Sequence, residues 1–362
     1  MRVLYVISTL EGGGAESQLC SYAIELKRLY PDVYFEICAI KSGGVFEKKI
    51  RENGIKYTVL KSNNLVKSVF MLRKIIQKGK FDIVHAHMLL SDIISRFATI
   101  TTSAKLVATH HGLGKWKKKP LILLDKMTKF RVDNFVMVSE QSMHLRLKRE
   151  KYPREKTQVI FNGISSDFLS KEPKELPESD QKIIIGTTAR MTDNKQINLM
   201  IDVMKDLEQS PNIFYEIIGH GENYEKLVEQ TKILNLTERV RFLGWQDNIL
   251  PIIERWHIFA MPSINEDLPV SMLECMAQGI VPVASSVGGI IALLNENKNG
   301  ILCDSANRKT FTDAIEYLIA NPNEYKKISK NARQFICETF LISNTVDKTI
   351  ALYKKTLNRI DE

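Results

Sequence analysis

Residues 263–289 read SINEDLPVSMLECMAQGIVPVASSVGG and predict a loop, a short helix and a buried strand in succession. Pro269 suits the first helical position, and Gly279 suits the residue just past the helix end. Glu266 then precedes the helix, and Glu274 lies about a turn and a half inside it. The free backbone N–H groups at a helix start, with the positive end of its dipole, suit a phosphate. The stretch therefore predicts a site for a sugar–diphosphate–nucleoside, in which the two carboxylates accept hydroxyls on either side of the phosphates.

Two further motifs bear on this interpretation, because the glutamates alone fit a simpler one in which Glu266 caps the helix and Glu274 is solvated. The stretch Ala189-Arg-Met-Thr-Asp-Asn-Lys195 leaves an apolar strand. Arg190 and Lys195 can therefore reach one diphosphate, Arg through two donors and Lys as a point charge. Solvent-facing cations are the alternative for this pair.

The stretch Glu11-Gly-Gly-Gly-Ala-Glu16 opens a helix after the first strand. Its glycines let the backbone approach a ligand closely, and the helix start attracts an anion. A tight turn between strand and helix explains the glycines equally well. The stretch does not fit the G-x-G-x-x-G fingerprint of dinucleotide-binding proteins.

Together these motifs resemble the retaining, nucleotide-sugar-dependent glycosyltransferases of the GT-B fold, known as group 1 or family four. The E-x7-E, R-x4-K and G-G-x-E patterns of that family all match, and the resemblance covers almost the whole chain. Its specificity lies mostly in residues 186–289. Two positions depart from the family pattern, since Asp267 replaces the usual Gly and Ala292 replaces a common glutamate. Asp267 adds a negative charge beside the expected sugar, which puts the usual sugar contacts in doubt.

The resemblance implies roles for individual residues. Arg190 and Lys195 would neutralise the leaving diphosphate, while His111 and Glu266 would contact the donor sugar. Glu274 would hold the ribose hydroxyls. Further contacts to the nucleotide sugar are expected from Gly13, Gly14, Gly219, Gly221, Leu243, Leu268, Pro269, Val270 and Ser271. Glu16 and His87 are expected on the acceptor side.

Histidines mark the ends of two predicted strands, in His85-Ala-His87 and His110-His-Gly112. An i, i+2 histidine pair is able to ligate a metal, but no Cys, carboxylate or His follows at a supporting spacing. No Asp-x-Asp sequence occurs, so a metal-bridged diphosphate is not indicated. We therefore expect no metal and no cofactor besides the nucleotide-sugar donor, for which uridine is favoured over guanosine.

The alternation of short apolar strands with amphipathic helices predicts an α/β protein with parallel sheets. With the resemblance, the expected fold is GT-B: two doubly wound, Rossmann-like domains facing across a cleft. An acceptor-binding domain is expected over residues 1–165, a linker over 166–181 and a nucleotide-sugar-binding domain over 182–342. A helix at about 343–362 is expected to pack back on the first domain. Strands are expected at 2–8, 34–39, 57–60, 82–85, 105–109, 134–138, 158–161, 183–189, 214–218, 240–243, 258–261, 281–284 and 300–302.

The net charge of +9 hides an asymmetry between the two halves of the chain. Residues 1–165 hold 29 Lys/Arg and 14 Asp/Glu, whereas the remainder holds 22 and 28. A basic half makes nucleic acid or an anionic membrane the candidate partner. The densest cluster is Lys115, Trp116, Lys117, Lys118 and Lys119, followed by an aliphatic run. An ordinary solvated loop is the alternative, but Trp beside aliphatics suits the bilayer interface, so we expect membrane contact and no nucleic acid.

The five scattered cysteines form no C-x-x-C pair, and no stretch approaches the roughly 18–20 apolar residues of a spanning helix. We therefore expect a cytoplasmic protein held peripherally at the inner face of the plasma membrane. The expected activity is retaining transfer of a hexose or N-acetylhexosamine to a lipid-linked or surface-polysaccharide acceptor, such as capsule, exopolysaccharide or O-antigen. A nucleotide-sugar epimerase of the GT-B fold and a non-enzymatic protein that binds nucleic acid or membrane are the alternatives.

Overall fold

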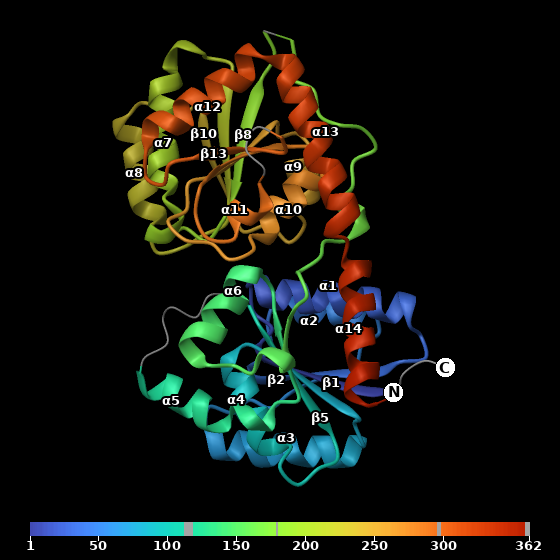
Figure 1. The fold of residues 1–362 in the computed structure, drawn as a ribbon. Coiled ribbons are helices and arrows are strands. Elements are labelled where there is room, and N and C mark those ends of the chain that lie inside the picture. The colour runs from blue at the N-terminus through green and yellow to red at the C-terminus, as the bar shows by residue number, and fades with distance from the viewer. Residues whose placement is uncertain (112–118, 179, 295–297, 359–362) are drawn as a thin grey trace. The chain divides into compact units, whose positions relative to one another are not determined.

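The computed structural model describes residues 1–111, 119–178, 180–294 and 298–358 (Figure 1). The chain forms two compact units, one of Met1–Ser165 with Leu341–Glu362 and one of Ser166–Phe340. Each unit is built on one sheet whose paired strands all run parallel. This doubly wound arrangement is the one that apolar strands alternating with amphipathic helices favour.

The first unit holds a seven-stranded sheet in the order β3-β2-β1-β4-β5-β6-β7. Its strands are β1 (Arg2–Thr9), β2 (Tyr34–Ser42), β3 (Tyr57–Val59), β4 (Ile83–His87), β5 (Lys105–His110), β6 (Asn134–Met137) and β7 (Thr157–Val159). Its helices are α1 (Gly14–Leu29), α2 (Phe46–Glu52), α3 (Leu65–Gly79), α4 (Leu89–Ala98), α5 (Lys119–Thr128), α6 (Glu140–Leu145) and α14 (Ile342–Thr356), with helical turns η1 (Lys129–Arg131), η2 (Arg146–Glu150) and η3 (Arg154–Lys156).

Alternate residues of β1 are buried on opposite faces of this sheet. Tyr5 and Ile7 belong to the core that α1 and α14 complete, whereas Leu4 and Val6 belong to the core that α3 and α4 complete. Both faces are therefore covered, which explains why residues 3–7 of β1 are a continuous apolar run instead of alternating with polar residues. Figure 1 shows α14 beside α1, although these helices come from the two ends of the chain.

The chain leaves the first unit and re-enters it at the same place. Ile342 N donates a hydrogen bond to Ile164 O over 2.9 Å, and Thr345 Oγ1 donates to Phe161 O over 3.0 Å. A Cβ on Gly163 would lie 2.4 Å from Ile342 Cα, so only glycine allows this close approach. The first unit is thus completed by the final helix of the chain.

The second unit holds a six-stranded sheet in the order β10-β9-β8-β11-β12-β13. Its strands are β8 (Ile183–Thr188), β9 (Ile213–Ile218), β10 (Val240–Gly244), β11 (Ile258–Met261), β12 (Val281–Ser285) and β13 (Ile301–Cys303). Its helices are α7 (Ile197–Asp206), α8 (Tyr224–Ile233), α9 (Leu250–Ile253), α10 (Val270–Ala277), α11 (Ile290–Leu293), α12 (Arg308–Ala320) and α13 (Pro322–Thr339), with turns η4 (Ser166–Phe168), η5 (Asp193–Lys195) and η6 (Leu207–Gln209).

Residues 166–181, expected to be a linker, are instead packed on the second unit. Ser170 N donates to Ala277 O over 3.2 Å, and Lys174 N donates to Ser329 Oγ over 2.7 Å. The prolines and charges of this segment do exclude regular secondary structure over most of its length. They carry no information about its backbone partners, which are more than 100 residues away in sequence.

The helix predicted within residues 263–289 is α10. It begins at Val270, so Pro269 takes the N-cap position and not the first helical position. Gly279 follows the helix end with φ +72° and donates from its N–H to Met276 O over 2.9 Å. An L side chain is strained at this φ, which explains glycine at the position. The predicted order of loop, helix and strand is present.

Candidate active site

Ligands of doubly wound sheets bind beyond the carboxyl ends of the strands, where the strand order reverses. In the second unit this switch point lies between β8 and β11. Lys195 stands in the loop after β8 and Glu266 in the loop after β11, and Lys195 Nζ forms an ion pair with Glu266 Oε1. Their side chains are only 22 % and 11 % exposed. Two motifs that lie 71 residues apart in the sequence therefore meet at the switch point.

Asn194 joins the same two loops through its backbone carbonyl and its side-chain amide. Its carbonyl accepts from Ile264 N over 2.8 Å, and its side-chain Nδ2 donates to Asn265 O over 3.0 Å. These bonds fix the loop that carries Lys195 against the loop that carries Glu266. Sequence reasoning missed both asparagines, and the signal available was a short amide side chain directly beside each motif residue.

The start of α10 follows directly from the Glu266 loop. Leu268 and Pro269 are buried, while Val270 and Ser271 form the first turn and are partly exposed. The first amides of a helix have no partner within it and lie at the positive end of the dipole, so they can bind an anion. Glu274 lies one turn further along α10 and is partly buried.

The loop between β12 and α11 packs against the loop that carries Glu266. Gly289 N donates to Glu266 O over 3.1 Å, and a Cβ on Gly289 would lie 1.4 Å from Asp267 O. Only glycine fits at this contact. The G-G of the sequence motif therefore positions the backbone around Glu266 and Asp267, and Asp267 itself is partly buried.

Arg190 follows β8 with an exposed side chain. The next backbone segment packs against the Gly219-His220-Gly221 loop, since Met191 N donates to His220 O over 3.1 Å. Cβ atoms on Gly219 and Gly221 would lie 2.1 Å and 2.4 Å from the carbonyl oxygens of Ala189 and Met191. Loop packing alone therefore requires these two glycines, so their presence does not by itself indicate contact with a nucleotide base.

The loops after β9 and β10 also meet, through a bond of 2.8 Å from Gly219 N to Gly244 O, next to Leu243. The ring of His220 stacks on Tyr224 with 4.8 Å between centroids and 15° between planes. His220 is exposed, and Phe242 meets Tyr224 edge-on. Sequence reasoning missed this aromatic pair, although an aromatic between the two glycines and another four residues later was a readable signal.

The switch point of the first unit lies between β1 and β4. Glu16, in the first turn of α1, is 8 % exposed and accepts a hydrogen bond of 3.0 Å from Thr9 Oγ1 at the end of β1. Gly13 is the N-cap residue, and a Cβ there would lie 2.3 Å from Glu16 Oε2. A Cβ on Gly14 would have no heavy atom within 4 Å. Thr9 and Gly13 thus hold the Glu16 carboxylate at the α1 start.

Three histidines lie together at the ends of β4 and β5. His85 Nε2 bonds Thr109 Oγ1 over 2.7 Å, and His85 Nδ1 bonds Tyr353 OH over 2.5 Å. The rings of His85 and His87 are 4.4 Å apart, and His87 Nδ1 bonds His111 Nε2 over 3.0 Å. The Tyr353 hydroxyl on α14 and the ends of β4 and β5 therefore hold the three imidazoles in one continuous row.

Burial keeps these imidazoles neutral. It lowers the pKa of His85 to about 3 and that of His111 to about 4, and holds the pKa of His87 well below its usual value. The His87–His111 contact is consequently an N–H···N bond between two neutral rings. His87 Nε2 and His111 Nδ1 are buried and have no hydrogen-bond partner among the described residues. One of these two atoms is then a donor and the other an acceptor.

Some expected features fall outside these two sites. Residues 115–118 of the expected membrane contact lie outside the described residues, and Lys119 begins α5. Within the described ranges, no group of three His, Cys, Asp or Glu side chains is arranged to hold a metal ion. Over the same residues, no helix combines the length and apolar character needed to cross a membrane.

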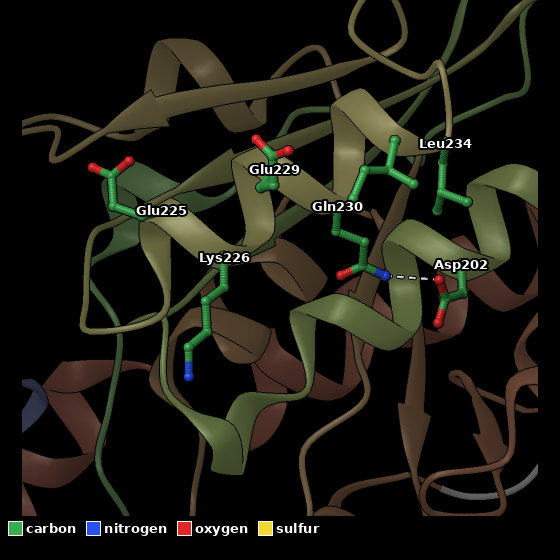
Figure 2. Close-up of a pocket in the computed structure, with 7 residues that line it drawn as sticks. Asp202, Glu225, Lys226, Glu229, Gln230 and Leu234 are labelled. Carbon is green, nitrogen blue, oxygen red and sulfur yellow. Dashed lines mark hydrogen bonds between the residues drawn. The ribbon is translucent and has the colours of Figure 1, made fainter.

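A shallow hollow on the second unit lies between α7 and α8 (Figure 2). Asp202, Glu225 and Glu229 line it with a single cation, Lys226, and Gln230 Nε2 donates to Asp202 Oδ1 over 2.7 Å. The hollow lies between helices and not at strand ends. Three carboxylates would also repel a diphosphate, so this is not the candidate donor site.

The sequence matches two glycosyltransferase profiles. Residues 12–168 match the family described as Glycosyltransferase Family 4, and residues 170–335 match the family described as Glycosyl transferases group 1. The two matches meet where the chain passes from the first compact unit into the second. The chain therefore carries a glycosyltransferase family 4 domain followed by a glycosyltransferase group 1 domain, and its two parallel-sheet, Rossmann-like domains have the GT-B fold.

Individual proteins resemble the chain over most of its length. The UDP-Gal:alpha-D-GlcNAc-diphosphoundecaprenol alpha-1,3-galactosyltransferase of Escherichia coli is 26 % identical over 307 residues, 80 % of this chain and 79 % of that protein. The N-acetyl-alpha-D-glucosaminyl L-malate synthase of Bacillus anthracis is 20 % identical over 342 residues, 92 % of this chain and 86 % of that protein. The crystal structure of Anabaena HepE in complex with UDP has a TM-score of 0.86 and 18 % identity, covering 98 % of this chain and 100 % of that one.

Proposed function

We propose that this glycosyltransferase moves a hexose or N-acetylhexosamine from a UDP-sugar to a lipid-linked or surface-polysaccharide acceptor, with retention of the anomeric configuration. One observation carries the proposal: Lys195 and Glu266 meet at the switch point of the second unit, directly ahead of α10. A cation, a carboxylate and a helix start placed together suit a diphosphate flanked by hydroxyls. No dinucleotide fingerprint competes with this assignment.

Each group in the second unit receives a role from its chemistry. Arg190, Lys195 and the amides of the first α10 turn stabilise the charge that develops on the leaving diphosphate. Glu274 accepts from the ribose hydroxyls and Glu266 from the hexose. The resemblance to the family, and not the loop geometry, assigns the base side to the loop at Gly219 and Gly221 and to Leu243 of β10. This charge relief needs no metal ion, which is part of the proposal.

The first unit receives the remaining roles. His111 faces the donor sugar, and Glu16 and His87 take the acceptor side. Because the imidazoles are neutral, they serve the substrate as hydrogen-bond partners and not as fixed charges. The acceptor hydroxyl then attacks from the face of the leaving group, and a phosphate oxygen takes its proton, which retains the anomer. An inverted anomer in the NMR spectrum of the product would contradict this mechanism.

The donor and acceptor are inferred from relatives and from charge. HepE was crystallised with UDP and the Escherichia coli relative is named for UDP-Gal, which favours a uridine donor. The same relative acts on a diphosphoundecaprenol acceptor, whereas the Bacillus anthracis relative is named for L-malate. The excess of 29 basic over 14 acidic residues in residues 1–165 favours the lipid-linked acceptor and work at the cytoplasmic face of the plasma membrane.

Donor binding tests the proposal directly. We expect calorimetry with a panel of UDP- and GDP-sugars to find one tight donor, and Glu274→Ala to weaken it at least about tenfold through loss of a charge-assisted bond. The matched control is Glu229→Ala, which removes an exposed carboxylate of α8. Absence of binding to every nucleoside diphosphate would refute the transferase. Turnover of the donor without any acceptor would instead identify the epimerase.

A further inference from the structure

One layer of the first unit has large apolar side chains that no other described residue of the unit covers. Helices α3, α4 and α5 lie on the face of the sheet opposite α1 and α14, and they pack side by side (Figure 1). We call α3, α4, α5 and η1 the α3–α5 layer. Its exposed large apolar side chains are Leu65, Val66, Phe70, Ile100 (just after α4), Leu123, Met127 and Phe130. Phe130 is 71 % exposed, so these side chains are not merely at the margin of the core.

The segment α5–η1 exposes three large apolar side chains and buries one carboxylate. Leu123, Met127 and Phe130 follow i, i+4, i+7 spacing, which places them on one helical face, and all three are exposed. The opposite side of α5 carries Asp125, whose side chain is fully buried. An ordinary surface helix buries its apolar side chains and exposes its charges. This arrangement in α5–η1 therefore needs a reason outside the unit's own core.

A buried ionic network holds α5 in this orientation. Arg96 Nη1 of α4 lies 2.8 Å from Asp125 Oδ1, and Tyr152 OH donates to Asp125 Oδ2 over 2.8 Å. Asp92 pairs with the same guanidinium over 2.5 Å. Rotation of α5 would separate Asp125 from Arg96 and leave buried charges unpaired, which costs folding free energy. The network therefore prevents α5 from rotating to bury its apolar face. The apolar face of α5 is thus fixed toward the outside.

The charge around these apolar side chains is almost wholly positive. The described residues 61–111 and 119–131 contain 12 Lys/Arg and three Asp/Glu. Two of the three acids, Asp92 and Asp125, are fully buried in the network together with Arg96, and Asp82 accepts a bond from Arg2 N. Lys67, Lys74, Lys78 and Lys126 are exposed on α3 and α5. Apolar side chains on a cationic surface have the composition that binds the interface of an anionic bilayer.

We propose that the α3–α5 layer is the surface by which the first unit docks on an anionic lipid bilayer. Leu123, Met127, Phe130 and Phe70 enter the interface, while the surrounding lysines meet lipid phosphates. Docking through this layer would hold the enzyme at the membrane that contains its proposed lipid-linked acceptor. In this respect the inference rests on the proposed function. A symmetric pairing of two copies through this layer would bring like charges together, and a nucleic-acid backbone would leave the aliphatic side chains without a partner.

Flotation of the full-length protein with vesicles tests the proposal. We expect binding to vesicles of phosphatidylcholine with 30 mol % phosphatidylglycerol at low salt, and little binding to phosphatidylcholine alone. The triple variant Leu123→Ser/Met127→Ser/Phe130→Ser should lower the partition coefficient at least about tenfold, since apolar burial and charge both contribute to interfacial binding. Lys74→Glu/Lys126→Glu should lower it too and reduce its salt dependence. Ile233→Ser/Tyr317→Ser, which removes exposed apolar side chains of the second unit, should leave it unchanged.

The outcomes separate this surface from the enzyme's function. Equal vesicle binding by the triple variant and the wild type would overturn the proposal, as would salt-sensitive binding to RNA with none to anionic vesicles. Concentration-dependent dimerisation lost in the triple variant, without vesicle binding, would overturn it in favour of self-association. Hydrogen exchange of β1 and β4 peptides, which belong to the first unit, checks that this unit is folded in every variant. Vesicle binding without any nucleotide binding would leave the docking surface in place and refute only the transferase.

Discussion

The ion pair of Lys195 and Glu266 sets the charge that the second unit offers to a diphosphate. Without a ligand, the Lys195 ammonium is already compensated by a carboxylate that is only 11 % exposed. The Arg190 side chain is exposed and has no side-chain hydrogen bond or ion pair within the described part of the chain. A diphosphate bound as we propose would therefore share Lys195 with Glu266, whereas Arg190 would be free to pair with the diphosphate alone.

We predict that Lys195→Met weakens UDP binding and lowers kcat/KM at least about tenfold, because one charge-assisted hydrogen bond contributes about 1.5–3 kcal/mol. Isothermal calorimetry and initial rates measure the two effects. Lys205→Met is the control, since Lys205 forms an exposed ion pair with Glu208 on the surface of the same unit. Unchanged UDP affinity in Lys195→Met would remove the lysine from the phosphate site.

The buried histidines predict how the first unit responds to acid. The pKa of His85, about 3, and that of His111, about 4, lie below the ordinary value of about 6.5 expected in the unfolded chain. Between pH 6.5 and 4 the unfolded state therefore binds more protons than the folded state, and the free energy of unfolding falls as the pH falls. Each such histidine contributes up to about 1.4 kcal/mol per pH unit.

Hydrogen exchange of β4 peptides between pH 7 and 5, corrected for intrinsic exchange rates, measures this effect. We expect the free energy of opening β4 to fall as the pH is lowered toward 5. In His85→Asn this free energy should depend less steeply on pH. The exposed His144 gives the control variant His144→Asn, which should keep the full trend. A pH-independent opening free energy would show that the imidazoles are protonated in the folded state.

At the level of elements, the contact between the β12–α11 loop and the Glu266 loop depends on a single missing Cβ. Gly289→Ala places that atom 1.4 Å from Asp267 O, so the loop ahead of α10 must move. We predict a loss of roughly 1–3 kcal/mol in stability, typical of overpacking, and weaker donor binding. Thermal unfolding and UDP calorimetry measure the two effects.

Gly14→Ala is the matched control for stability, since a Cβ there meets no heavy atom within 4 Å. At the first position of α1, alanine should keep or raise the melting temperature. The reason is that alanine favours the helix over glycine by up to about 1 kcal/mol of free energy. A melting temperature equal to wild type in Gly289→Ala would mean that the Glu266 loop tolerates displacement.

The elements show what the sequence reveals and what it hides. Strands and helices were predictable to within a few residues because apolar periodicity, prolines and glycines are local signals, and α10 is an example. The packing of residues 166–181 on the second unit was not, because its backbone partners at Ala277 and Ser329 have no local signature. The exposed apolar face of α5 was likewise hidden, because only the structure shows that Asp125 is buried against Arg96.

For the candidate site, the sequence motifs indicate residues near strand ends but do not indicate which of these residues pair. The motifs placed Lys195 and Glu266 at strand ends, but their ion pair depends on a switch point that only the strand order defines. The row from Tyr353 through His85 to His111 brings the last helix next to two strand ends. No spacing rule connects residues so far apart in the chain.

At the scale of the whole molecule, α14 makes the first unit dependent on the end of the chain. Val346 and Tyr353 are fully buried in the core that covers β1. We predict that a chain ending at Phe340 keeps the second unit folded and loses the first. Limited proteolysis with mass spectrometry should then protect peptides of 183–340 and cleave throughout 1–165. Full protection of both units would show that α14 is dispensable.

The same discontinuity has a consequence during synthesis. The first unit begins at Met1, but its final core residues follow the 175 residues of Ser166–Phe340. At about 5–20 residues per second, the ribosome takes roughly 10–35 s to supply them. The second unit is therefore complete while the face of β1 that α14 covers is still open to solvent. Domains usually fold in the order in which they leave the ribosome, whereas here all residues of the later unit are synthesised before the last helix of the earlier one.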